Sequence, residues 1–162
     1  TEENMNITVI SVGKIKEKYF TAAIDEYSKR LSRFAKLNII EVADEKIPDN
    51  ASEKEMEQIK EKEGNKILAK LPQNSFVVTL CIEGKEHSSE ELAKKIADIS
   101  MTSSHITFII GGSLGLSDTV KSKSALRLSF GKMTLPHQLM RVVLLEQIYR
   151  AFKINNNESY HK

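Results

Sequence analysis

The sequence has a single cysteine, Cys81, which lies in an apolar run. One cysteine forms no disulfide within the chain and no cysteine metal cluster, so we expect a buried, inert thiol in a reducing cytoplasm. The sequence also has no apolar run approaching the roughly 20 residues that span a bilayer. No basic-then-apolar leader opens it, so we expect neither membrane insertion nor secretion. Residues 1–4 are polar and precede Met5, and we expect them to be a cloning remnant ahead of a native start at Met5.

The chain also has little excess of either charge, since 24 Lys and Arg against 22 Asp and Glu leave a net charge of +2. That total is too small to argue for nucleic-acid binding. The distribution is less even, because the chain from Lys121 onward holds eight Lys or Arg and only two acids. Either a solvated face or a polyanionic partner accounts for this basic C-terminal part.

The pattern of apolar residues predicts one α/β domain over residues 5–162, which is long enough to bury a core. Five β-rich runs alternate with segments of helical periodicity, which favours a mainly parallel sheet with helices on both faces. We expect strands at 6–12, 37–43, 75–82, 105–110 and 124–130, and helices at 17–34, 52–70, 88–99, from 118, and at 136–154. Ser52 with Glu55, and Ser88 with Glu91, are capping boxes. Gly64 is expected to interrupt the second helix and Gly84 to turn the chain after the third strand.

Two loops rich in small residues follow the last two predicted strands. The first, residues 111–116 (GGSLGL), is neither a G-x-G-x-x-G dinucleotide fingerprint nor a P-loop. It is either a tight turn that needs positive φ or a place where backbone approaches a ligand closely. The second, residues 131–136 (GKMTLP), supplies N–H groups that can hold an adenine edge or a carboxylate. Open α/β sheets bind ligands at the carboxyl ends of strands, so the loops predict a small-molecule pocket lined by main chain.

The last predicted helix begins with side chains suited to proton transfer. His137 and Arg141 are four residues apart and share a face. The helix dipole disfavours a protonated His137, so its imidazole either accepts a proton and orients a substrate or is simply solvated. No second His or carboxylate stands at metal-ligand spacing, and we expect no metal. Ser113 lacks a G-x-S-x-G frame, which argues against a hydrolase.

Several motifs occur together and in a fixed order: residues 7–14 (ITVISVGK), 111–116 (GGSLGL), 129–138 (SFGKMTLPHQ), 141–151 (RVVLLEQIYRA) and 160–162 (YHK). The set resembles the RlmH-type 23S rRNA methyltransferases of the SPOUT superfamily, and the resemblance runs from Met5 to Lys162. It implies a trefoil knot at the C-terminal end of the sheet and a homodimer. It also implies transfer of a methyl group from S-adenosylmethionine to nitrogen 3 of a pseudouridine in 23S rRNA, on the assembled ribosome. The implied cofactor contacts are Leu80, Gly111, Gly112, Phe130, Gly131, Lys132, Met133, Thr134 and Leu135.

The same resemblance suggests roles in catalysis and RNA binding. Arg141 is expected to stabilise the charge on the imide, and His137 or His161 to accept its proton. Tyr149 and Tyr160 would stack on or hydrogen-bond to the base, with buried packing as the alternative for Tyr149. The expected RNA contacts are Arg150, Lys153, Tyr160 and Lys162.

Two alternatives and one departure accompany this interpretation. The first alternative is a non-catalytic RNA- or ribosome-binding module with a vestigial pocket. The second is a nucleotide-dependent oxidoreductase, which the missing dinucleotide fingerprint disfavours. Family tails carry an Arg-Gly pair where this chain has Asn156-Asn157. Asn tolerates left-handed backbone, so we expect the turn to be kept while a phosphate-binding arginine is lost.

Overall fold

A five-stranded sheet forms the centre of the computed structural model, which describes residues 5–160. Its strand order is β2-β1-β4-β3-β5, and every pairing is parallel. The strands are β1 (Asn6–Val12), β2 (Lys36–Val42), β3 (Phe76–Glu86), β4 (His105–Ile110) and β5 (Leu126–Ser129). The predicted α/β fold with a mainly parallel sheet is confirmed.

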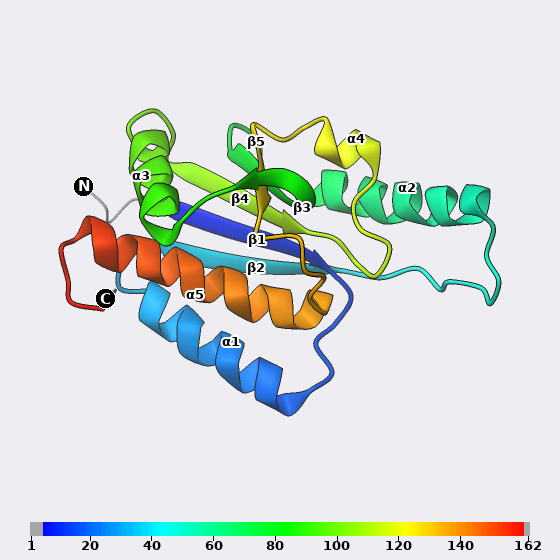
Figure 1. The fold of residues 1–162 in the computed structure, drawn as a ribbon, viewed down its shortest axis with the longest axis horizontal. Helices are drawn as coiled ribbons and strands as arrows, with labels where there is room; N and C mark the ends of the chain where they lie inside the picture. The colour runs from blue at the N-terminus through cyan, green and yellow to red at the C-terminus, as the bar shows by residue number, and fades with distance from the viewer. Residues whose placement is uncertain (1–4, 161–162) are drawn as a thin grey trace.

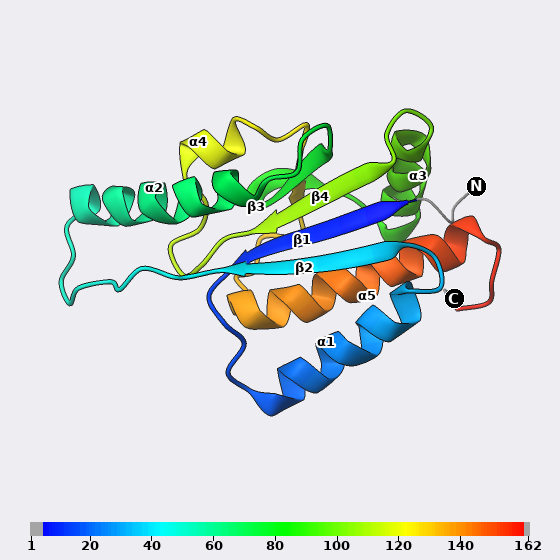
Figure 2. The same cartoon turned by 180° about the vertical axis from the view of Figure 1, so that it is seen from behind.

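Helices cover both faces of this sheet (Figures 1 and 2). On one face lie α1 (Lys18–Leu31), α3 (Ser89–Ser100) and α5 (His137–Asn155), and on the other α2 (Glu53–Lys70) and α4 (Asp118–Lys121). Successive strand residues point to opposite faces, so Val78 belongs to the core beneath α3 and α5 while Val77 belongs to the core beneath α2 and α4. Two hydrophobic cores therefore hold the three layers together.

Both predicted capping boxes are formed. The Ser52 hydroxyl accepts the Glu55 N–H at 3.1 Å, and the Glu55 carboxylate accepts the Ser52 N–H at 3.2 Å. Ser88 and Glu91 make the same pair of bonds at 3.1 and 2.7 Å. Each box satisfies two backbone donors that the first helical turn leaves without partners, which fixes where α2 and α3 begin.

The predicted turn at Gly84 was wrong, because β3 continues to Glu86 and pairs with β5 on both sides of an irregularity between Leu80 and Lys85. A Cβ atom on Gly84 would lie 2.7 Å from the carbonyl oxygen of Arg127 in β5. The glycine therefore allows a close approach of two backbones and does not end the strand.

The predicted interruption at Gly64 was also wrong, since α2 runs unbroken from Glu53 to Lys70. A Cβ on Gly64 would lie 2.6 Å from the hydroxyl oxygen of Ser117, whose side chain caps α4 by accepting the Val120 N–H. Packing of α2 against the start of α4 thus accounts for a residue that costs helix propensity.

Two smaller predictions concern Cys81 and the C-terminal turn. Cys81 is buried and free, as expected. Asn157 has a φ of 54°, so an asparagine does adopt the left-handed conformation near the end of the chain. Residues 1–4, His161 and Lys162 lie outside the described residues. No helix among residues 5–160 is long and apolar enough to cross a membrane.

Candidate active site

The two loops, residues 111–116 and 131–136, meet beyond the carboxyl ends of β4 and β5 and beside the middle of β3, where they line a cavity of about 650 Å³, here called the loop cavity. Its walls come from the middle of β3, the loop after β4, and the segment that joins β5 to α5. The lining residues are Leu80–Ile82, Ile110–Gly115, Leu128, Phe130, Gly131, Met133–His137 and Met140. The loops predicted to form a pocket therefore lie on one cavity.

All the residues predicted to contact a cofactor line this cavity except Lys132. Sequence reasoning missed Cys81, Ile82, Ile110, Leu128 and Met140. Cys81 and Ile82 directly follow Leu80 and end the predicted strand 75–82, so the strand-end rule already pointed to them. Met140 lies one helical turn after Pro136, and the 3.6-residue period of α5 was the signal for it.

The loop after β4 forms a tight turn with positive φ, and it also lines the cavity with closely packed backbone. Gly115 has a φ of +84°, and its N–H donates to the Gly112 carbonyl at 3.0 Å, which closes a tight turn. At Gly111 a Cβ would lie 2.7 Å from the carbonyl carbon of Gly115. One glycine thus supplies the left-handed conformation, and another lets the loop fold onto itself at the cavity wall.

The segment between β5 and α5 presents main-chain donors. The Ser129 hydroxyl donates to the Ile82 carbonyl at 2.9 Å and accepts the Gly131 N–H at 3.1 Å, which fixes the start of the segment. Gly131 has a φ of +121°. Within residues 5–160, the N–H groups of residues 132–135 have no hydrogen-bond acceptor. Four consecutive donors beside a cavity can bind a polar edge or an anion.

A second cavity of about 620 Å³ adjoins the first and is here called the neighbouring pocket. Its lining residues are Val12–Lys14, Lys16, Glu41–Glu45, Ile47, Glu63, Gly112, Ser113, His137 and Gln138. Gly112, Ser113 and His137 line both cavities. A ligand in one cavity would therefore be separated from a ligand in the other only by this shared wall.

His137 is the titratable residue of the shared wall. It is the first residue of α5, following Pro136 at the N-cap. Burial and the nearby positive charge of Arg141 lower the pKa of His137, and Asp44 opposes that shift. The imidazole is consequently neutral at neutral pH and able to accept a proton.

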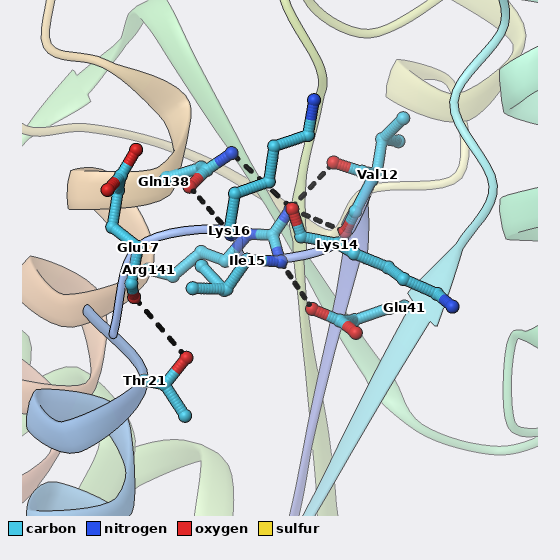
Figure 3. Close-up of polar contacts among 10 residues, drawn as sticks. Val12, Lys14, Ile15, Lys16, Glu17, Thr21, Glu41, Gln138 and Arg141 are labelled. Carbon is cyan, nitrogen blue, oxygen red and sulfur yellow. Dashed lines mark hydrogen bonds and ion pairs between the residues drawn. The ribbon is translucent and has the colours of Figure 1, made fainter. Parts of the chain in front are cut away.

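Arg141 lies one turn along α5 and is only 4% exposed. Its Nη2 donates to the carbonyl oxygens of Val12 and Gly13 at 2.6 and 2.8 Å, and its Nη1 pairs with the Glu41 carboxylate at 2.8 Å (Figure 3). Its Nε has no hydrogen-bond partner among the described residues. Burial lowers the pKa of Arg141, while Glu41 raises it. The guanidinium thus ties α5 to the ends of β1 and β2.

The remaining candidate residues cluster at the other end of α5. Tyr149 is buried against Phe34 and meets the Tyr160 ring edge-on at 5.0 Å, so the packing alternative describes its contacts. Tyr149 follows His137 by three helical turns, a separation of about 18 Å at 1.5 Å per residue. The structure therefore does not bring Tyr149 and His137 together within one chain.

Ion pairs connect the other members of this cluster. Arg150 pairs with Glu146 at 3.0 Å, and Lys153 pairs with Glu158 at 3.1 Å. The Tyr160 hydroxyl donates to Glu146 at 2.8 Å, and burial together with that bond raises the pKa of Tyr160 to about 12. His161 and Lys162, which were also predicted to act in catalysis and RNA binding, lie outside the described residues.

Metal chemistry has no candidate site in the part of the chain that the structure describes. There, no group of three or more His, Cys, Asp or Glu side chains is arranged to hold a metal ion. The site therefore consists of main-chain donors, apolar walls, one imidazole and one buried guanidinium.

Comparison with known proteins identifies relatives of the whole chain. A family model described as "Predicted SPOUT methyltransferase" matches residues 5–161. The chain is 60% identical to the ribosomal RNA large subunit methyltransferase H of Clostridioides difficile (strain 630) and 62% identical to that of Clostridium novyi (strain NT). Each match covers 98% of this chain and 100% of the relative.

Solved structures with low sequence identity share the fold. A probable methylase family protein from Haemophilus influenzae Rd KW20 superposes with a TM-score of 0.53 at 14% identity, over 100% of this chain and 72% of that protein. A protein from Legionella pneumophila, described as a methyltransferase in complex with SAM, gives 0.50 at 13% identity, over 92% and 67%. The family model matches residues 5–161, and full-length relatives are 60% identical or more. The chain therefore belongs to the SPOUT methyltransferase family.

Proposed function

We propose that this protein transfers a methyl group from S-adenosylmethionine to nitrogen 3 of a pseudouridine in large-subunit (23S) rRNA, on the assembled ribosome. The observation that carries the proposal is the pair of adjoining cavities that share Gly112, Ser113 and His137. Methyl transfer needs a donor site and an acceptor site in contact across such a wall. Membership of a methyltransferase family and the rRNA methyltransferase names of the relatives support the choice of donor and substrate.

The loop cavity fits S-adenosylmethionine in size and in chemistry. Its volume of about 650 Å³ lies within the range of small-molecule sites. The unpaired N–H groups of residues 132–135 suit the adenine edge or the amino-acid carboxylate, and Leu80 and Phe130 supply apolar walls. We propose that Leu80, Gly111, Gly112 and Phe130–Leu135 hold the cofactor, within the C-terminal trefoil knot that the family resemblance implies.

The bound cofactor supplies a methyl group already activated by a sulfonium centre, so the protein has to position the acceptor nitrogen in line and remove its proton. We assign proton removal to His137, whose neutral imidazole stands between the two cavities. Arg141 is absent from the lining of both cavities and is paired with Glu41, so its stabilisation of the imide anion would act at a distance. The bonds from Arg141 to Val12 and Gly13 add a positioning role.

A homodimer would bring the two ends of α5 into one site. Tyr149 lies about 18 Å from His137 along the same helix, which is too far for both to touch one base. We propose that the tail of one protomer completes the pocket of its partner. The residues assigned to this contact with base or RNA are Tyr149, Arg150, Lys153, Tyr160, His161 and Lys162.

Calorimetry with S-adenosylmethionine is the first test, and we expect one binding site per chain. Absence of binding would favour a non-catalytic ribosome-binding module. The second test is nucleoside mass spectrometry of 23S rRNA from a strain that lacks this protein. We expect 3-methylpseudouridine to disappear, and an unaltered profile would reject the proposal.

A further inference from the structure

The segment between β1 and α1, residues 13–17, is here called the β1–α1 loop, and side chains from β2 and α5 fix its backbone (Figure 3). The Gln138 side chain donates to the Lys14 carbonyl and accepts the Lys16 N–H, both at 3.4 Å. The Glu41 carboxylate accepts the Ile15 N–H at 3.3 Å. Arg141 donates to the Gly13 carbonyl at 2.8 Å. The four successive residues 13–16 are thus held by three side chains distant in sequence.

This loop carries two exposed lysines, Lys14 and Lys16, which both line the neighbouring pocket. Their side chains diverge from the loop (Figure 3). Within residues 5–160 neither ammonium group forms an ion pair or a hydrogen bond, whereas Lys66, Lys121 and Lys153 are all paired with carboxylates. The two charges are therefore available to a ligand at the edge of the pocket.

Most carboxylates of the pocket do not neutralise these lysines. Glu41 is engaged by Arg141, and Glu45 is paired with Lys66 at 2.6 Å. Burial raises the pKa of Glu63, which favours its uncharged form. Asp44 is the remaining acidic group in the lining. The β1–α1 loop therefore presents two ammonium groups, unpaired within residues 5–160, at the edge of the pocket, with Asp44 in the lining and Glu17 at the end of the loop as the nearby acids.

We propose that the β1–α1 loop binds the RNA backbone, with Lys14 and Lys16 each contacting a phosphate beside the nucleotide that enters the neighbouring pocket. This inference rests on the proposed function, because it takes the neighbouring pocket as the site of the target base. A base that enters that pocket leaves its own phosphodiester linkages at the rim, where the two lysines stand. Phosphate contacts position a nucleic acid without reading its sequence.

The fixed backbone gives these contacts a second consequence. Gln138 and Arg141 hold the loop from the same helix that carries His137. Phosphates bound by the loop are therefore set in a defined register relative to His137. Because the loop is ordered before RNA arrives, little conformational entropy is lost on binding.

The test compares a Lys14→Gln/Lys16→Gln double variant with Lys54→Gln/Lys123→Gln, a control that removes the same charge from exposed lysines outside both cavities. Binding to purified 70S ribosomes is measured over a series of salt concentrations. Two lost phosphate contacts should reduce the slope of log K against log salt by roughly 1.5. The control should keep the wild-type slope. Calorimetry with S-adenosylmethionine should give wild-type affinity for both variants, which verifies folding.

Each outcome bears on one claim. A shallower slope and a raised KM for ribosomes in the Lys14/Lys16 variant alone would support the inference. Equal slopes for the two variants would overturn it, even if wild-type protein methylates rRNA normally. If wild-type protein fails to bind S-adenosylmethionine or to methylate, the proposed function fails, and the ribosome-binding slopes still decide whether the loop contacts RNA.

Discussion

Substitution of Gly111 by Ala tests whether the loop after β4 is shaped for a bound cofactor. The added Cβ would lie 2.7 Å from the carbonyl carbon and 2.9 Å from the carbonyl oxygen of Gly115. Ordinary van der Waals contact begins near 3.4 Å, so the backbone has to move by several tenths of an ångström. Overpacking of this kind costs about 1–3 kcal/mol.

That strain is expected to appear in cofactor binding, because Gly111 and Gly115 both line the loop cavity. If the loop relieves the collision by opening, S-adenosylmethionine has to close it again. The dissociation constant should then rise by roughly 5- to 150-fold, since about 1.4 kcal/mol corresponds to a factor of ten. Isothermal titration calorimetry measures this directly, and thermal unfolding reports any part of the strain retained in the unliganded protein.

Gly112→Ala, at a second residue assigned to the cofactor, is the comparison that separates a backbone collision from a side-chain collision. Its Cβ would meet the Val12 side chain at 3.1 Å, which is a milder overlap than the 2.7 Å contact of a Cβ on Gly111. We expect a much smaller loss of affinity than for Gly111→Ala. If Gly111→Ala binds the cofactor as tightly as wild type and unfolds at the same temperature, the account of this loop is incorrect.

Three further predictions concern titratable and charged residues of the site. Because the pKa of His137 is lowered from 6.5, kcat measured against pH should show an acidic limb with its midpoint below 6.5, where the imidazole becomes protonated. A His137→Gln variant that kept this acidic limb would exclude His137 as the proton acceptor. The pKa of Glu63 is raised from 4.5, so its contribution to stability is complete below 4.5 and is lost as the pH rises through the folded-state pKa. In urea unfolding at about pH 8, the free energy of unfolding of Glu63→Gln should therefore exceed that of wild type by about 1–3 kcal/mol, and below pH 4.5 the two proteins should be equally stable. An equal gain in stability at both pH values would refute the raised pKa of Glu63. Arg141→Lys keeps the positive charge but loses the planar guanidinium that reaches Val12, Gly13 and Glu41. Methylation should therefore be lost while the cofactor affinity measured by calorimetry is retained. Normal methylation by this variant would remove Arg141 from the mechanism.

Local signals predicted the elements and the main cavity. Apolar periodicity and the capping boxes located the helices, and the segments rich in small residues after two strands located the loops that meet at residues 111–115 and 130–136. Gly64 and Gly84 were misinterpreted because their roles are close approaches to Ser117 and Arg127, which are distant in sequence. A single sequence cannot distinguish a glycine that breaks an element from one that admits a neighbour.

The candidate site also combines features that local sequence predicts with features that depend on contacts between distant residues. The loop cavity was predictable from strand ends, whereas the bond from Arg141 to Val12 joins residues 129 apart in sequence and depends on how α5 lies across the sheet. The distance between His137 and Tyr149 was predictable from the helical rise of 1.5 Å per residue, and it places Tyr149 beyond reach of a base at His137 of the same chain. Lys14 and Lys16 carried no comparable signal in the sequence, because they lie far from the basic C-terminal part of the chain and their place beside the pocket depends on the fold.

Methylation of defined ribosomes is the most direct test of the central claim. Purified protein is incubated with isotope-labelled S-adenosylmethionine and 70S ribosomes from a strain without endogenous activity, and the 23S rRNA is digested for nucleoside mass spectrometry. The account predicts label in 3-methylpseudouridine at one position, lost when the pseudouridine is replaced by uridine. Label in another nucleoside, or no transfer by protein that binds the cofactor, would contradict it.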